Sequence, residues 1–179
     1  MREIDARLQA RSAAVVWRSH VGRPWRESLP ADGPRPQVVI VNGEGTIHHT
    51  ADSERARELV KVAAFARNEL GARTCLINAT LHAIAEPALD GLRLFDTIHV
   101  RDSASRDELA RAGIAATVVP DITVAASLPA TGAPRAGVCG TDSVVSADAR
   151  ALRRICRARG WSYWPMTYRF RVSAKRWPS

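Results

Sequence analysis

The sequence has little cysteine and no long apolar run. Its three cysteines, Cys75, Cys139 and Cys156, are far apart and form no C-x-x-C pair, which is typical of free thiols in a reducing compartment. No apolar run approaches the roughly 20 residues that a membrane-spanning helix needs, and the first residues, MREIDARLQAR, lack the apolar segment of a secretory signal. We therefore expect a cytoplasmic protein without a transmembrane segment.

Acidic residues are absent from the C-terminal part of the chain. All 18 lie between Glu3 and Asp148, so residues 1–149 hold 17 basic and 18 acidic residues, whereas residues 150–179 hold nine basic residues and no acidic one. A nucleic-acid-binding domain more often carries its basic face over the whole fold, so we expect no specific nucleic-acid binding. The basic tail can still bind polyanions or contact an anionic membrane peripherally.

Strand and helix patterns alternate through residues 37–120. Short β-branched runs predict strands at 38–41, 74–77, 97–100 and 116–119. After a cap at Asp52 or Ser53, the helical stripe Ala56, Leu59, Val60, Ala63, Ala66 and Leu70 predicts the first crossover helix, and Gly71 ends it. Ser105 to Glu108 reads as a capping box that opens another helix. The alternation predicts an α/β fold, with a Rossmann-like parallel sheet and helices on both faces.

The sequence also predicts two domains. Residues 1–125 form a Rossmann-like N-terminal domain, and the small, Pro- and Gly-containing residues 126–135 form a linker. Residues 136–179 then form the incomplete start of a second α/β domain with a basic tail, with a strand at 136–139, a helix at 147–159 and a strand at 161–164. A full α/β domain needs roughly 100 residues or more, and fewer than that follow the linker.

Polar residues follow each predicted strand of the first domain. Since ligands bind beyond the carboxyl ends of parallel strands, these positions are the candidate substrate-binding residues. They are Asn42, Gly43, Gly45 and Thr46 after the first strand, Asn78 after the second, Arg101 and Ser105 after the third, and Asp121 after the fourth. Glu44 and His48, in and after the glycine turn, are the candidate acid and base.

The glycine turn matches the dinucleotide fingerprint only in part. Gly43 and Gly45 fit G-x-G-x-x-G, but His48 occupies the third position. Two glycines still let backbone N–H groups approach an anion, and a turn without a ligand is the alternative. His48 and His49 suit acid–base or phosphate contact, or a structural role. Adjacent histidines on regular structure point apart, so no metal is expected.

Arg101 is the preferred anion contact. Its planar guanidinium suits phosphate or carboxylate, and it lies directly before a helix N-terminus. A salt bridge to a nearby acid is the alternative for Arg101. Ser105 is most simply a helix cap, and Asp121 either orients Arg101, accepts a sugar hydroxyl or ends a turn.

These motifs together resemble one known family. N-G-E-G-T-I-H-H, then L-I-N-A-T, then V-R-D-S-x-S-x-x-x-L-x-x-x-G-I, then V-V-P-D-I-T, in this order, are similar to the polysaccharide pyruvyl transferases. The later T-D-S-V before a helix is similar to the start of that family's second domain. The similarity covers roughly residues 36–165.

The resemblance implies two Rossmann-like domains facing a cleft, as in GT-B glycosyltransferases. It implies transfer of a pyruvyl group from phosphoenolpyruvate to sugar hydroxyls, in the biosynthesis of a bacterial surface polysaccharide or exopolysaccharide. The partners would be phosphoenolpyruvate as donor and a glycan or lipid-linked saccharide as acceptor, with no cofactor. Arg101 takes the family's R-D-x-x-S position as an anion contact, and the turn from Gly43 to Thr46 would line the cleft.

The chain also departs from the family. Family members are usually longer, and the strand and glycine-rich turn that open their first domain are not evident here. We therefore expect a truncated member of the family that is inactive alone. If the chain is active, the expected activity is that of a pyruvyl transferase. The alternatives are a fragment of a GT-B-type nucleotide-sugar glycosyltransferase and a non-catalytic binding protein with a basic tail.

Overall fold

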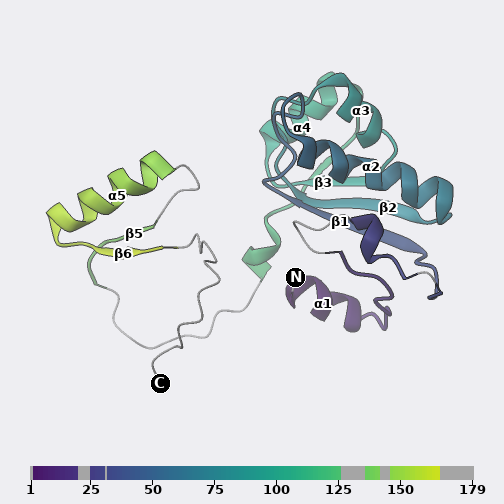
Figure 1. Cartoon of the computed structure of the whole chain (residues 1–179), viewed down its shortest axis with the longest axis horizontal. Coiled ribbons are helices and arrows are strands. Elements are labelled where there is room, and N and C mark those ends of the chain that lie inside the picture. The colour runs from purple at the N-terminus through teal and green to yellow at the C-terminus, as the bar shows by residue number, and fades with distance from the viewer. Residues whose placement is uncertain (1, 20–24, 31, 126–135, 142–145, 166–179) are drawn as a thin grey trace. The chain divides into compact units, whose positions relative to one another are not determined.

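The chain forms two compact units, Met1–Leu128 and Pro129–Ser179 (Figure 1). A computed structural model describes residues 2–19, 25–30, 32–125, 136–141 and 146–165. The predicted linker at 126–135 lies outside these residues. Within the described ranges, no helix combines the length and the hydropathy that crossing a membrane requires.

The first unit is built on a four-stranded parallel sheet in the order β1-β2-β3-β4. Its elements are α1 (Arg2–Gln9), the 3-10 helix η1 (Trp25–Ser28), β1 (Val38–Glu44), α2 (Glu54–Glu69), β2 (Arg73–Ala79), α3 (Glu86–Leu92), β3 (Thr97–Val100), α4 (Ser103–Arg111), β4 (Thr117–Val118) and the 3-10 helix η2 (Ile122–Ala125). The α/β fold and the parallel sheet are confirmed. Figure 1 shows α2, α3 and α4 together on one side of the sheet and α1 on the other.

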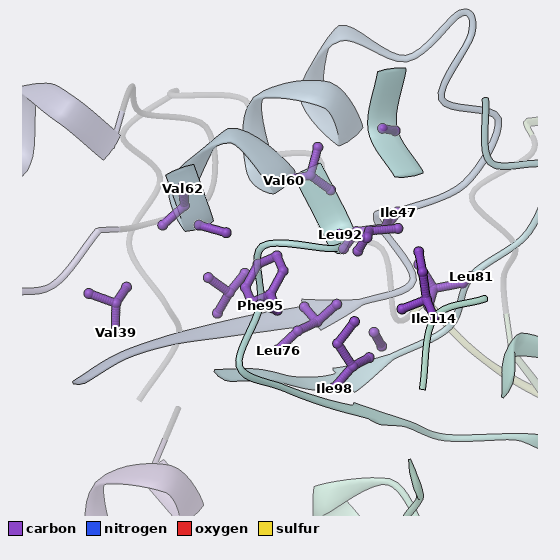
Figure 2. Packing of buried hydrophobic residues seen from close by; sticks show 14 of the residues in the cluster. Val39, Ile47, Val60, Val62, Leu76, Leu81, Leu92, Phe95, Ile98 and Ile114 are labelled. Atoms are coloured by element: carbon purple, nitrogen blue, oxygen red, sulfur yellow. The ribbon is translucent and has the colours of Figure 1, made fainter. Parts of the chain in front are cut away.

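The core lies between the sheet and the helices α2 to α4. Alternate strand residues are buried, and Val60 of α2 and Leu92 of α3 lie over Leu76 and Ile98 of the sheet (Figure 2). Each fully buried leucine of this kind contributes about 1.5–3 kcal/mol relative to an exposed one. The predicted stripe of α2 is confirmed, since four of its residues are buried and two are partly buried against the core: Ala56, Val60, Ala63 and Ala66, then Leu59 and Leu70. Ser53 caps the helix by accepting the Ala56 N–H.

Strand β1 continues three residues further than predicted. Asn42 pairs with Ile77 and Glu44 pairs with Ala79. The first part of the glycine turn, residues 42–44, therefore belongs to the sheet. Gly43 permits this because a Cβ there would lie 2.7 Å from the Ala79 Cβ. Only a residue without a side chain lets the two strands approach so closely at their carboxyl ends.

The cap predicted for α4 was wrong. The helix begins at Ser103, and its N-cap is Asp102, whose carboxylate accepts the Ser105 N–H at 2.7 Å. That backbone N–H lowers the pKa of Asp102 despite some desolvation. Ser105 therefore lies inside the first turn of the helix, which frees its hydroxyl for another contact.

The second unit is described as one β-α-β unit. Its elements are β5 (Cys139–Thr141), α5 (Ser146–Arg159) and β6 (Ser162–Trp164), and the two strands are parallel. The predicted helix and last strand are confirmed, whereas the strand predicted at 136–139 begins only at Cys139. Cys156 anchors α5, because it is buried against Gly140, where there is no room for a Cβ.

Candidate functional site

The ends of β1, β2 and β3 meet the segment after β4 at one edge of the sheet. Hydrogen bonds between side chains connect all four of these segments. The residues that they join are Asn42, Glu44, Asn78, Thr80, Arg101 and Asp121. Because parallel strands present their carboxyl ends on the same side, residues far apart in sequence form one cluster there.

Arg101 is held by two neighbours. Its Nε and Nη2 donate to Thr80 Oγ1 at 3.0 and 2.8 Å, and its Nη1 donates to Asp121 Oδ2 at 2.6 Å. These bonds use three of the five N–H groups of a guanidinium. The other two have no acceptor in the described part of the chain, and 26% of the side chain is exposed. The salt bridge that was the alternative role for Arg101 is thus present. It still leaves two N–H donors of a fixed guanidinium, which can bind a further anion.

The Asp121 carboxylate is itself firmly held. The backbone N–H of Thr123 is the largest influence and the Arg101 guanidinium the next, and together they lower the pKa of Asp121 to about 2. The Thr123 hydroxyl donates to the same carboxylate at 2.7 Å. Asp121 therefore stays ionised at neutral pH and orients Arg101.

Acid should remove the contribution of the Asp121 carboxylate to stability over the pH range in which that group becomes protonated. A carboxyl whose pKa falls from 3.8 to about 2 on folding stabilises the fold fully above its unfolded pKa and loses that contribution as the pH falls through its folded pKa. The unfolding free energies of the wild type and Asp121→Asn should differ most above about pH 4. The difference should close as the pH approaches 2, and a gap that is constant from pH 6 to pH 2 would show that Asp121 is not held in this way.

Two asparagines connect the first and second strands. Asn78 Nδ2 donates to Asn42 Oδ1 at 3.2 Å, and Asn42 Nδ2 donates to Glu44 Oε1 at 2.9 Å. Asn78 Oδ1 accepts the Ile122 N–H at 3.2 Å. Glu44 and Asn78 have φ values of 45° and 55°, a conformation that is uncommon outside glycine and tends to occur at functional sites.

The two glycines of the turn have different environments. Gly43 is buried between β1 and β2, so its place is in the sheet packing. Gly45 is exposed, and the nearest atom to a Cβ there would be Arg101 Nη2 at 3.8 Å. Thr46 closes the turn, with its N–H donating to the Gly43 carbonyl at 3.1 Å. The backbone beside Arg101 is therefore the part of the turn that a ligand can approach.

His48 belongs to a separate group of side chains. Its Nδ1 lies 3.0 Å from His49 Nδ1, and the His49 ring is 5.2 Å from that of His82. The expectation that His48 and His49 point apart was wrong, because a φ of 47° at His49 takes the chain out of regular structure. His82 in turn lies 3.6 Å from Glu108 of α4. Within the described residues, no hydrogen bond links this group to Arg101.

Ser105 faces the protein interior. It is fully buried, and its hydroxyl accepts the Leu81 N–H at 2.9 Å and donates to the Leu81 carbonyl at 3.3 Å. Its observed contacts therefore fix the chain that follows β2, next to Thr80.

Ser105→Ala tests that interpretation. The change leaves the buried Leu81 N–H without its partner, which should lower the free energy of unfolding by about 1–3 kcal/mol. Urea denaturation measures the loss, and Ser103→Ala, on the exposed side of the same turn, is the control with little expected effect. Equal stabilities of the two variants would contradict a structural role for Ser105.

Sequence reasoning did not single out Thr80 as a site residue. It follows Asn78 by two positions at the same strand end, and its N–H donates to the Glu44 carbonyl at 2.7 Å. Thr80 ends the stretch L-I-N-A-T at the end of the second predicted strand, but a threonine at that position indicates no particular contact. In the structure its hydroxyl accepts two hydrogen bonds from Arg101 and so supports it.

In the part of the chain that the structure describes, no group of three or more His, Cys, Asp or Glu side chains has an arrangement that could hold a metal ion. No protein-family model, curated protein or solved structure matches this chain. The fold and site define an α/β protein with a Rossmann-like parallel sheet and a fixed arginine at its carboxyl edge.

Proposed function

We propose that this chain carries the first domain of a polysaccharide pyruvyl transferase, with Arg101 as an anion contact for the donor. The reaction would transfer a pyruvyl group from phosphoenolpyruvate to sugar hydroxyls of a bacterial surface polysaccharide or exopolysaccharide. The observation that supports it is Arg101, fixed by Thr80 and Asp121 at the sheet edge with two N–H donors to spare. The order of the sequence motifs, which resembles that family, supplies the choice of donor.

The chemistry of the donor suits this edge. Phosphoenolpyruvate carries a phosphate and a carboxylate, and both are bound best by a guanidinium and by backbone N–H groups. Arg101 supplies the first, and the exposed backbone at Gly45 lies beside it. Asn42 and Asn78 provide amide groups for the neutral parts of the substrates.

Ketal formation needs proton transfers. One sugar hydroxyl adds to C2 of phosphoenolpyruvate and a proton adds to C3, which becomes a methyl group. A second sugar hydroxyl then displaces inorganic phosphate from C2, and its proton passes to a base. An acid and a base are therefore required. In this proposal Glu44, which is exposed and contacts Asn42, and His48 fill these roles.

Binding and turnover test the proposal separately. Calorimetry should show that phosphoenolpyruvate binds to the chain and that a nucleotide-sugar does not. Phosphate release from phosphoenolpyruvate with a glycan acceptor should then be low for this chain alone. Binding of the nucleotide-sugar but not of phosphoenolpyruvate would favour the glycosyltransferase alternative and contradict the proposal.

A further inference from the structure

The second unit has a basic hollow of its own, of about 670 Å³. Ala147 and a row of arginines from α5 line it together with two aromatic residues that follow the helix. The lining side chains of interest are Arg150, Arg153, Arg154, Arg157, Trp161 and Tyr163.

The arginines lie along one side of α5. Arg150 is four positions from Arg154, and Arg153 is four positions from Arg157, the spacing at which side chains share a helix face. All four are exposed, and at a rise of about 1.5 Å per residue they extend over about 10 Å. Asp148 is the one acidic residue of the helix, so the row is not neutralised by its own element.

The aromatic side chains lie on the same side as the arginines. Trp161 is 36% exposed, with the Arg159 guanidinium 5.3 Å from its ring centroid. Its backbone N–H donates to the Cys156 carbonyl at 2.9 Å, which fixes the start of the following strand. Tyr163 is held less closely, with its hydroxyl 3.5 Å from the Ala149 carbonyl. The hollow thus combines positive charge with flat apolar surfaces.

We propose that this hollow binds single-stranded nucleic acid without strong sequence preference. Proteins that do so combine a positively charged groove, which follows the phosphates, with aromatic rings on which bases stack. A helix that lies on a membrane instead places its aromatic residues opposite its basic face. Here Trp161 and Tyr163 line the same hollow as the arginines. The hollow is lined by residues of the second unit alone, so it does not rest on the function proposed for Arg101.

Fluorescence polarisation of the full chain with a labelled oligodeoxythymidine of 15 nucleotides tests the proposal. Changing Arg150, Arg154 and Arg157 together to glutamine should weaken binding in 50 mM salt at least about tenfold. It should also reduce the slope of log K against log salt by about 2, since each phosphate contact on a single strand contributes about 0.7. Trp161→Ala should weaken binding about tenfold through lost stacking, with the salt slope unchanged.

Three controls keep the test specific. Arg55, Arg93 and Arg106 changed together to glutamine remove the same charge from the first unit and should leave binding nearly unchanged. Lysine in place of the three α5 arginines keeps their charge and should preserve the salt slope. A lysine variant that binds would show that the glutamine variant fails through lost charge and not through lost folding. Vesicles with anionic lipid should bind more weakly than the oligonucleotide.

Two results would overturn the proposal. One is an unchanged oligonucleotide affinity and salt slope in the glutamine variant. Because this variant keeps every basic residue after position 165, that result would assign the binding to those residues. The other is binding to the vesicles without binding to the oligonucleotide, which would make the surface a membrane contact.

Discussion

Arg101→Ala should weaken the binding of phosphoenolpyruvate by about 10- to 100-fold. A hydrogen bond to a charged group contributes about 1.5–3 kcal/mol, and each 1.4 kcal/mol is about a tenfold change in affinity. The variant loses both free N–H donors, and it also leaves the Asp121 carboxylate facing the anion without its counter-charge. Calorimetric titration at pH 7 measures the change.

Two further variants make the Arg101 test specific. Arg101→Lys keeps the charge but cannot hold Thr80 and Asp121 at once while presenting two donors, so its affinity should lie between those of the wild type and the alanine variant. Arg106→Ala, at an exposed arginine of α4 that pairs with Asp107, should bind like the wild type. Unchanged affinity in Arg101→Ala would remove Arg101 from the donor site.

Gly43→Ala should lower the free energy of unfolding by about 2–3 kcal/mol. The new Cβ would lie 2.7 Å from the Ala79 Cβ, 3.1 Å from Leu76 Cδ1 and 3.3 Å from the Ala79 Cα. These atoms belong to a paired strand and to a fully buried side chain, so the strands must move apart. Overpacking of this kind typically costs about 1–3 kcal/mol. Urea denaturation gives the free energy directly.

Gly45→Ala is the matched control for Gly43. Its Cβ would meet only Arg101 Nη2, at 3.8 Å, which is an ordinary contact with a flexible side chain. The fold should therefore keep its stability, while any ligand that approaches the backbone there should bind less well. Similar destabilisation by the two substitutions would show that Gly43 is not the point of close strand approach.

The order of strands and helices could be predicted because it depends on local pattern. β-branched runs bounded by turn residues indicated the strands, and the stripe from Ala56 to Leu70 indicated the helix that covers them. The cap of α4 could not be predicted in this way, because Asp102 and Ser105 are both good N-cap residues. Which of the two caps the helix depends on Leu81, because the backbone N–H and carbonyl of Leu81 form hydrogen bonds with the Ser105 hydroxyl.

The candidate site was predictable to a similar degree. Parallel strands bring their carboxyl ends together, so the proximity of Arg101 to Asp121 follows from the topology. The hydroxyl of Thr80 and the turn at His49 depend on side-chain rotamers and on backbone angles that single residues do not encode. The chemical roles of Glu44 and His48 remain predictions, since their geometry alone assigns no reaction.

Backbone amide spectra of the labelled protein, recorded by NMR during a phosphoenolpyruvate titration, test the central claim most directly. If the carboxyl edge of the sheet is the donor site, the amides of Gly45, Thr46, Thr80 and Arg101 should shift together and saturate at one dissociation constant. In Arg101→Ala, the amides of Gly45, Thr46 and Thr80 should shift only at phosphoenolpyruvate concentrations about 10- to 100-fold higher. Shifts confined to α5, or no saturable shift at all, would contradict the account.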